Sequence, residues 1–108
     1  MPEFMDPFCG MKPNRQLNER ELTRALRLSL AAEHEAIHLY EALADATENK
    51  LAKTVLQDIA DEEREHLGEF RRVIDLLLPD EAEHLQEGAE EVDELHTRLQ
   101  RGETPTDD

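Results

Sequence analysis

A stripe of apolar residues interrupted by charge constrains this sequence more than any other feature. In residues 50–79 the stripe follows alternating steps of three and four, the spacing of one helix face: Leu56, Ile59, Glu63, His66, Phe70, Val73 and Leu77. Its centre is a Glu-x-x-His pair, Glu63 and His66, where a helix core normally carries aliphatic side chains. The pattern predicts an amphipathic helix whose apolar face presents a carboxylate and an imidazole.

An earlier segment has the same arrangement. The spacing selects Leu22, Leu26, Ser29, Glu33, Ala36, Tyr40 and Leu43, flanked by Leu30 and Ile37. One carboxylate, Glu33, again lies at the middle of the stripe, and Tyr40 follows it two turns later on the same face. We therefore predict a second amphipathic helix of the same kind.

Capping signals set the limits of these helices. Asn18 followed by Glu21 is a capping box that opens the first helix, which we expect to end near residue 47. Thr47 or Asn49 then caps the second helix, and Pro79 ends it. A connection this short makes the two helices antiparallel neighbours. The sequence therefore predicts an all-α fold built on a two-helix hairpin.

The rest of the chain is less regular. Asp80 is expected to cap a shorter C-terminal helical segment that Gly88 interrupts. The segment before the hairpin lacks apolar periodicity, and the last residues have the composition of a disordered tail. The expected organisation is an irregular arm, a hairpin, a C-terminal helical segment and a tail, over residues 1–16, 17–79, 80–101 and 102–108.

Composition excludes several classes of function. The formal net charge of −15 argues against binding to nucleic acid or to anionic membranes and favours attraction of cations. No apolar run approaches the ~20 residues that span a bilayer, and residues 1–16 lack the apolar core of a signal peptide. Cys9 is the single cysteine, so no intrachain disulfide can form. These features predict a cytoplasmic protein.

The two interruptions are expected to meet. Glu33 precedes the predicted turn by about as many residues as Glu63 and His66 follow it, which places all three at one level of an antiparallel hairpin. Burying a carboxylate without a partner costs several kcal/mol, and neither stripe carries Lys or Arg. One such residue alone is more often an edge residue that reaches water. Three at one level indicate a metal site.

One hairpin supplies half of a carboxylate-bridged di-metal site. Helix-bundle di-iron sites take a Glu from each of two helices and a Glu-x-x-His from each of the other two. Two copies related by a two-fold axis would supply this set and bury both pairs of stripes in a four-helix bundle. Oxygen-rich sites with two imidazoles suit iron or manganese better than structural zinc.

The segment "LSLAAEHEAIHLYEALADATENKLAKTVLQDIADEEREHLGEFRRVIDLL" resembles the ferritin-like domain of encapsulated ferritins and, more distantly, rubrerythrins. The resemblance covers about residues 17–96 and is carried by Glu33-x6-Tyr40 with Glu63-x-x-His66. It implies that Glu33, Glu63 and His66 bind iron across a dimer interface and that Tyr40 lines the site. It also implies a homodimer that assembles into a ring, commonly a decamer, and an encapsulin shell as partner. The segment "RGETPTDD" does not resemble the usual cargo docking peptide.

The expected function is therefore a ferroxidase that oxidises Fe(II) with O2 at a di-iron site, for iron storage or detoxification, within an encapsulin nanocompartment. Manganese and zinc are candidate substitutes for iron. One alternative is a rubrerythrin-like di-iron peroxidase, and another is a non-catalytic helical oligomer stabilised by metal.

An acidic stripe lies on the second predicted helix, beside the apolar stripe that carries Glu63 and His66. It consists of Asp58, Glu62, Glu65 and Glu69. It is either a solvated helix face or a path that guides Fe(II), and on the second interpretation Glu62 and Glu65 are the nearest candidates.

Overall fold

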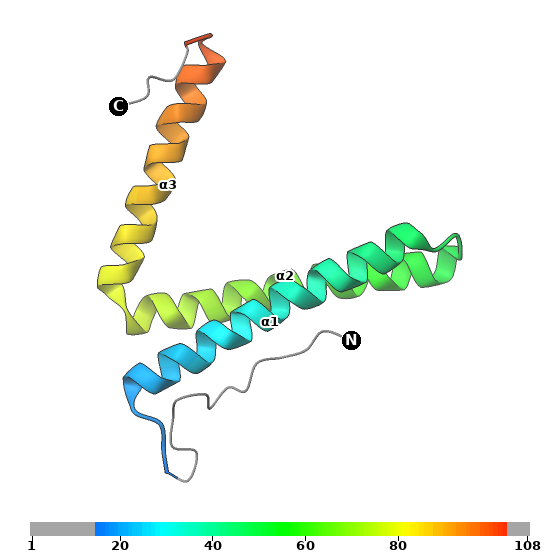
Figure 1. The fold of residues 1–108 in the computed structure, drawn as a ribbon, viewed down its shortest axis with the longest axis horizontal. Coiled ribbons are helices and arrows are strands. Elements are labelled where there is room, and N and C mark those ends of the chain that lie inside the picture. Colours follow the sequence, from blue (N-terminus) through cyan, green and yellow to red (C-terminus); the bar gives the residue numbers. More distant parts are fainter. Residues whose placement is uncertain (1–14, 104–108) are drawn as a thin grey trace. The chain divides into compact units, whose positions relative to one another are not determined.

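The fold is all-α, as predicted. The computed structural model describes residues 15–103 and contains three helices, α1 (Glu19–Ala46), α2 (Lys50–Leu77) and α3 (Pro79–Gln100). α1 and α2 pack side by side as an antiparallel hairpin (Figure 1). The chain divides into two compact units, the first ending at Leu77 and the second beginning at Leu78. None of the helices in residues 15–103 has the length and apolar character needed to cross a bilayer.

The predicted capping box opens α1. The Asn18 side chain accepts a hydrogen bond from the Glu21 amide at 2.8 Å, and the Glu21 carboxylate accepts one from the Asn18 amide at 3.1 Å. Glu21 is buried although it is charged, because the Arg15 guanidinium donates to both of its carboxylate oxygens at 2.6 and 2.9 Å. This hydrogen bonding raises the pKa of Arg15. The start of α1 is therefore stabilised both by the capping box and by the ion pair between Arg15 and Glu21.

A three-residue turn connects α1 to α2. The Asn49 side chain accepts a hydrogen bond from the Ala52 amide at 3.0 Å, so Asn49 is the cap of α2. Thr47, the other candidate, instead accepts from the Asn49 amide at 3.2 Å. The Lys53 ammonium crosses the turn to the carbonyl oxygen of Ala44 at 2.6 Å. α2 ends at Leu77, two residues before Pro79, as predicted.

The hairpin buries a narrow seam. Its most buried apolar residues are Ala60, Ala44, Ile74, Ala36 and Ile37, all with less than 9% of their surface exposed. The three alanines let the helix axes approach closely, and the isoleucines fill the remaining space. Two helices can exclude water only along the line where they meet, so the core of one chain is small.

Most of the predicted apolar stripe lies beside this seam. Leu22 and Leu43 of α1 and Val73 of α2 remain 38%, 47% and 44% exposed, and Leu56, Ile59 and Phe70 are half-buried. We call this surface, made of the stripe residues of both helices, the open face. Burial of the stripe is not achieved within one chain, and its burial by a second copy remains a prediction.

A charged cluster joins the helices outside the open face. The Arg64 guanidinium of α2 donates to the Glu41 carboxylate of α1 at 2.9 Å and to Asp61 at 2.9 Å. Gln57 also donates to Glu41, at 3.3 Å. The hydrogen bond from Arg64 is the largest cause that lowers the pKa of Glu41, and the hydrogen bond from Gln57 lowers it further. Because the cluster is exposed, its contribution to stability is small.

Two predictions about the C-terminal segment are wrong. Asp80 is not the cap of α3: the helix begins at Pro79, with Leu78 at the cap position and no side-chain cap bond. Proline is favoured at the first helical position, where its missing N–H costs nothing. Gly88 does not interrupt the helix either, since the ~1 kcal/mol cost of an interior glycine is offset by the strong helix formers around it.

The end of α3 uses a different glycine. Gly102 has φ of 80°, and its amide and that of Glu103 donate to the carbonyl oxygens of Leu99 and Arg98, both at 3.0 Å. This is a Schellman cap. The expectations of an irregular arm and a disordered tail concern residues 1–14 and 104–108 for the most part, which lie outside the described residues.

Replacing Asn18 by Ala should lower the free energy of unfolding by about 1 kcal/mol, because the amide of Glu21 loses its side-chain acceptor. Urea unfolding followed by circular dichroism measures the change. Asn18→Ser, which keeps an acceptor, should stay close to the parent protein. Equal losses in both variants would contradict the capping role.

The Glu41–Arg64 pair should stabilise the hairpin at neutral pH and cease to do so in acid. The lowered pKa of Glu41 means that its contribution is complete above the ordinary carboxyl pKa and is lost as pH falls through the lowered value. The thermal midpoint of Arg64→Gln should therefore lie slightly below that of the parent protein at neutral pH and converge with it on acidification. Arg72→Gln, which removes an unpaired surface charge, should show no such convergence.

Candidate metal centre

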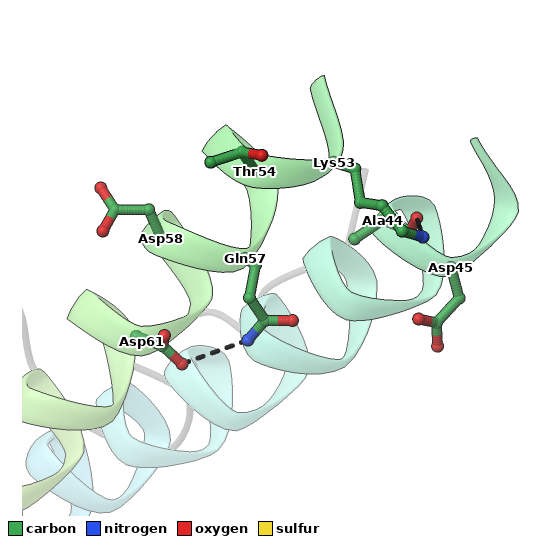
Figure 2. Close-up of a pocket in the computed structure, with 7 residues that line it drawn as sticks. All are labelled: Ala44, Asp45, Lys53, Thr54, Gln57, Asp58 and Asp61. Atoms are coloured by element: carbon green, nitrogen blue, oxygen red, sulfur yellow. Dashed lines mark hydrogen bonds between the residues drawn. The ribbon is translucent and has the colours of Figure 1, made fainter. Parts of the chain in front are cut away.

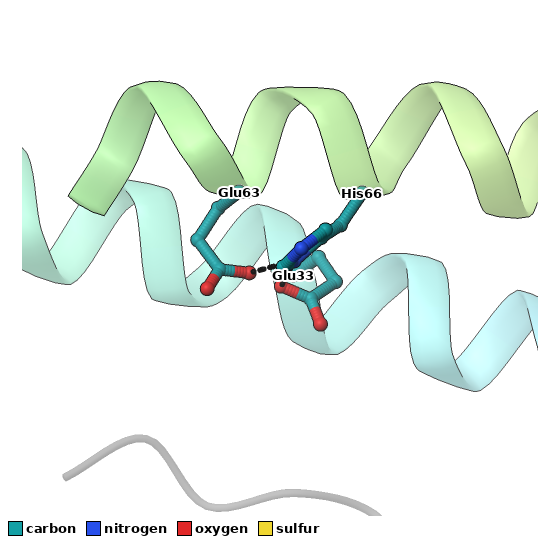
Figure 3. Close-up of side chains that lie close together, drawn as sticks. All are labelled: Glu33, Glu63 and His66. Carbon is teal, nitrogen blue, oxygen red and sulfur yellow. Dashed lines mark hydrogen bonds and ion pairs between the residues drawn. The ribbon is translucent and has the colours of Figure 1, made fainter. Parts of the chain in front are cut away.

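Three predicted ligands converge on the open face. Glu33 comes from α1, and Glu63 and His66 come from successive turns of α2 (Figure 3). His66 Nδ1 lies 3.3 Å from Glu63 Oε2 and 4.0 Å from Glu33 Oε2. One ligand atom from each residue lies within 4.8 Å of the others. Within residues 15–103 this is the single place where at least three such groups come this close.

Local helix geometry explains the convergence. Residues three apart on an α-helix lie on neighbouring turns of one face, so Glu63 and His66 point the same way. The short turn at Thr47–Asn49 and the close-packed seam fix how far α1 and α2 can slide past each other. Glu33 is thereby held opposite the Glu-x-x-His pair.

The cluster contains two acidic side chains and no Lys or Arg. Glu33 and Glu63 are acidic side chains, and the side chains that line the hollows beside them include no Lys or Arg. The Glu33 and Glu63 side chains are 24% and 18% exposed, and His66 is 49% exposed. Water reaches the cluster in a single chain. If the open face were covered, a cation would be needed to offset the cost of burying two carboxylates.

The donor set fits a divalent metal ion. Carboxylate oxygens and an imidazole nitrogen together suit iron, manganese or zinc. Three ligands from one chain leave coordination positions unfilled, unlike the closed tetrahedral sets of structural zinc. The cluster is therefore a carboxylate–histidine site able to hold a metal.

Two hollows lie beside the cluster. The first, of about 300 Å³, is lined by Tyr40, Glu33, Glu63, Phe70 and small residues of α1. We call it the tyrosine hollow. The second, of about 400 Å³, is the histidine hollow, lined by Leu26, Glu33, His66, Glu69, Phe70 and Val73. Glu33 and Phe70 line both, so the hollows adjoin at the cluster.

Of the remaining predicted residues, Tyr40 is brought to the cluster and two others are not. Tyr40 is half-buried and shares the tyrosine hollow with Glu33 and Glu63. Glu62 and Glu65 are exposed and line neither hollow. The acidic residue that does reach the site is Glu69, which the sequence pattern placed in the acidic stripe without distinguishing it. Its sequence position gave no signal, because Glu62 and Glu65 are also next to stripe residues.

A larger hollow lies away from the cluster, near the turn. It has a volume of about 450 Å³ and includes Asp45, Asp58, Asp61 and Lys53 (Figure 2). Gln57 donates to Asp61 at 3.2 Å across it, and Lys53 is engaged with the carbonyl oxygen of Ala44. Its aspartates do not converge as the ligands of the candidate centre do, so size does not identify the functional site here.

Sequence comparison matches the chain to a known family and to two known proteins. The rubrerythrin family model matches residues 17–105. The chain is 44% identical over 90 residues to the encapsulin nanocompartment cargo protein EncC of Myxococcus xanthus, covering 83% of this chain and 68% of that protein. It is 42% identical over 77 residues to a ferritin-like–encapsulin shell fusion protein of Pyrococcus furiosus, covering 71% of this chain and 22% of the fusion.

A solved structure supports the fold. The crystal structure of the encapsulated ferritin domain from Pyrococcus furiosus matches with a TM-score of 0.75 and 38% sequence identity, over 79% of this chain and 87% of that one. The hairpin is thus a ferritin-like arrangement. Together these matches show that the chain belongs to the rubrerythrin family, as an encapsulated-ferritin-like member.

Proposed function

We propose that the protein is a ferroxidase that oxidises Fe(II) to Fe(III) with O2 at a di-iron site shared by two copies of the chain. The observation that carries the proposal is the convergence of Glu33, Glu63 and His66 within 4.8 Å on the open face. Family membership supports it, since the site residues lie within the segment that matches the family model.

A second copy answers two requirements at once. One chain leaves an apolar surface partly exposed and provides three ligands. A two-fold partner that covered the open face would bury this surface and bring the ligand set to four carboxylates and two imidazoles. Four carboxylates balance the charge of two divalent cations, which removes the cost of burying them.

In this proposal iron is the substrate, and the chain supplies its surroundings. Each Fe(II) ion gives up one electron, and O2 takes up the electrons together with protons from water. Carboxylate oxygens are hard ligands, so Glu33 and Glu63 favour the more highly charged Fe(III) product over Fe(II). His66 fixes the position of the metal on α2. Tyr40, which lines the hollow beside both carboxylates, supports the site from α1.

The setting of the reaction is proposed from the relatives. One is named as a cargo protein of an encapsulin nanocompartment and another as a fusion to an encapsulin shell. We assign this chain a place inside an encapsulin shell in the cytoplasm. The assembly of its dimers into a ring, commonly of ten chains, is proposed from the resemblance to encapsulated ferritins. Iron oxidised at the ring would then be stored or detoxified within the shell.

Substituting a ligand should slow iron oxidation strongly. Glu33→Gln and His66→Ala should each slow aerobic Fe(II) oxidation, followed by near-ultraviolet absorbance, by at least the ~10- to 100-fold loss seen when groups that only support a ligand are removed. The matched control is Glu35→Gln, which changes the same charge about 200° round α1 from Glu33. Comparing O2 with hydrogen peroxide as oxidant separates a ferroxidase from a peroxidase.

Each alternative gives its own result in this assay. Faster reaction with peroxide than with O2 would favour the rubrerythrin-like peroxidase. Metal binding without turnover would favour the metal-stabilised oligomer. Ligand variants that oxidise iron as fast as Glu35→Gln would refute the assignment of the site.

Metal removal should weaken the dimer. Without cations, covering the open face would bring four carboxylates together with no partner, so a chelator should shift the population toward single chains. Native mass spectrometry with and without chelator measures this, and re-addition of Fe(II) under anaerobic conditions should restore the dimer. An oligomer distribution that ignores the chelator would contradict assembly through shared metal.

A further inference from the structure

The histidine hollow contains a carboxylate that the proposed ligand set does not use. Glu69 lines this hollow together with His66 and Glu33, and the other lining residues, Leu26, Phe70 and Val73, are apolar. In such surroundings a free carboxylate is the natural point of attraction for a cation. Glu69 is therefore the residue to explain at this side of the site.

Glu69 is free to receive a ligand. Among residues 15–103 it takes part in no hydrogen bond or ion pair, whereas the Glu41 carboxylate is held by Arg64 and the Glu21 carboxylate by Arg15. His66 directs its Nδ1 edge toward Glu63 and Glu33. The contacts of its ring therefore lie on the cluster side, and in a single chain the hollow that it shares with Glu69 is open at the edge where Glu69 lies.

The position of Glu69 distinguishes it from a permanent ligand. It lies three residues after His66, about 60° round α2 on the side opposite Glu63. It is not a member of the group whose ligand atoms come within 4.8 Å. It is exposed to solvent in a single chain, and it is not one of the stripe residues that a second copy is proposed to cover, so a cation can reach it before it reaches Glu33.

We propose that Glu69 is a delivery residue: it binds Fe(II) from solvent in the histidine hollow and passes it to Glu33 and His66. This inference rests on the proposed function, whose ligands are the destination. It replaces Glu62 and Glu65, which line neither hollow, as the residues that bring iron to the site. Glu69 touches the substrate on its way and takes no part in the oxidation.

The test measures how fast the full chain takes up Co(II), a divalent probe with visible absorbance that does not require turnover. Glu69→Gln should slow Co(II) association by about three- to tenfold, within the range of local electrostatic steering, and leave the amount bound at saturation unchanged. Glu69→Asp, which keeps the charge, should recover part of the rate. In the aerobic assay Glu69→Gln should raise the KM for Fe(II) and leave kcat unchanged.

Three control variants each remove one other negative charge: Glu62→Gln, Glu65→Gln and Glu35→Gln. Each is expected to slow Co(II) association less than about twofold. Slowing equal to that of Glu69→Gln in any of them would show a general effect of net charge and overturn the proposal. A normal rate in Glu69→Gln, or a lowered amount bound, would also overturn it. If Glu33→Gln binds as much Co(II) as the parent protein, it is the proposed site itself that fails.

Discussion

A two-helix hairpin cannot bury both of its apolar faces, and this limit shapes the whole molecule. α1 and α2 meet along a seam of small and branched residues such as Ala44, Ala60 and Ile74. The stripe beside the seam is left half-covered, and its centre holds two carboxylates and an imidazole. Covering that face without a cation would be costly, and leaving it bare keeps apolar surface in water. In the proposed dimer, metal binding and association would relieve both costs together.

The hairpin and the convergence of the three site residues were predictable from the sequence, because the signals for them are local. Alternating steps of three and four identified both helices of the hairpin. Asn18 and Pro79 fixed their outer limits, and the cap of the second helix was narrowed to Thr47 or Asn49. Glu33, Glu63 and His66 stood out because each breaks an apolar stripe at the same distance from the turn. The number of residues between each of them and the turn was enough to predict that they meet.

Other features depend on information that spacing does not contain. Periodicity cannot separate the intrachain seam from the open face, because both fall within one wide apolar sector of each helix. The start of α3 was misjudged because Pro79 both ends one helix and begins the next, and the cost of Gly88 is too small to decide alone. Glu69 could not be distinguished from Glu62 and Glu65, since only the packed side chains show which carboxylate borders the histidine hollow.

The connection between α1 and α2 has a consequence for how such a chain can vary. Residues in surface turns usually accept insertions and deletions without harm. Here the turn at Thr47–Asn49 sets the register of two rigid helices whose ligands lie far from it. Adding a single residue to either helix between the turn and the ligands would rotate one carboxylate by about 100° and displace it by about 1.5 Å along the axis. Natural variation in length should therefore be confined to the segments outside Glu33 and His66, and the span between them should keep a constant number of residues.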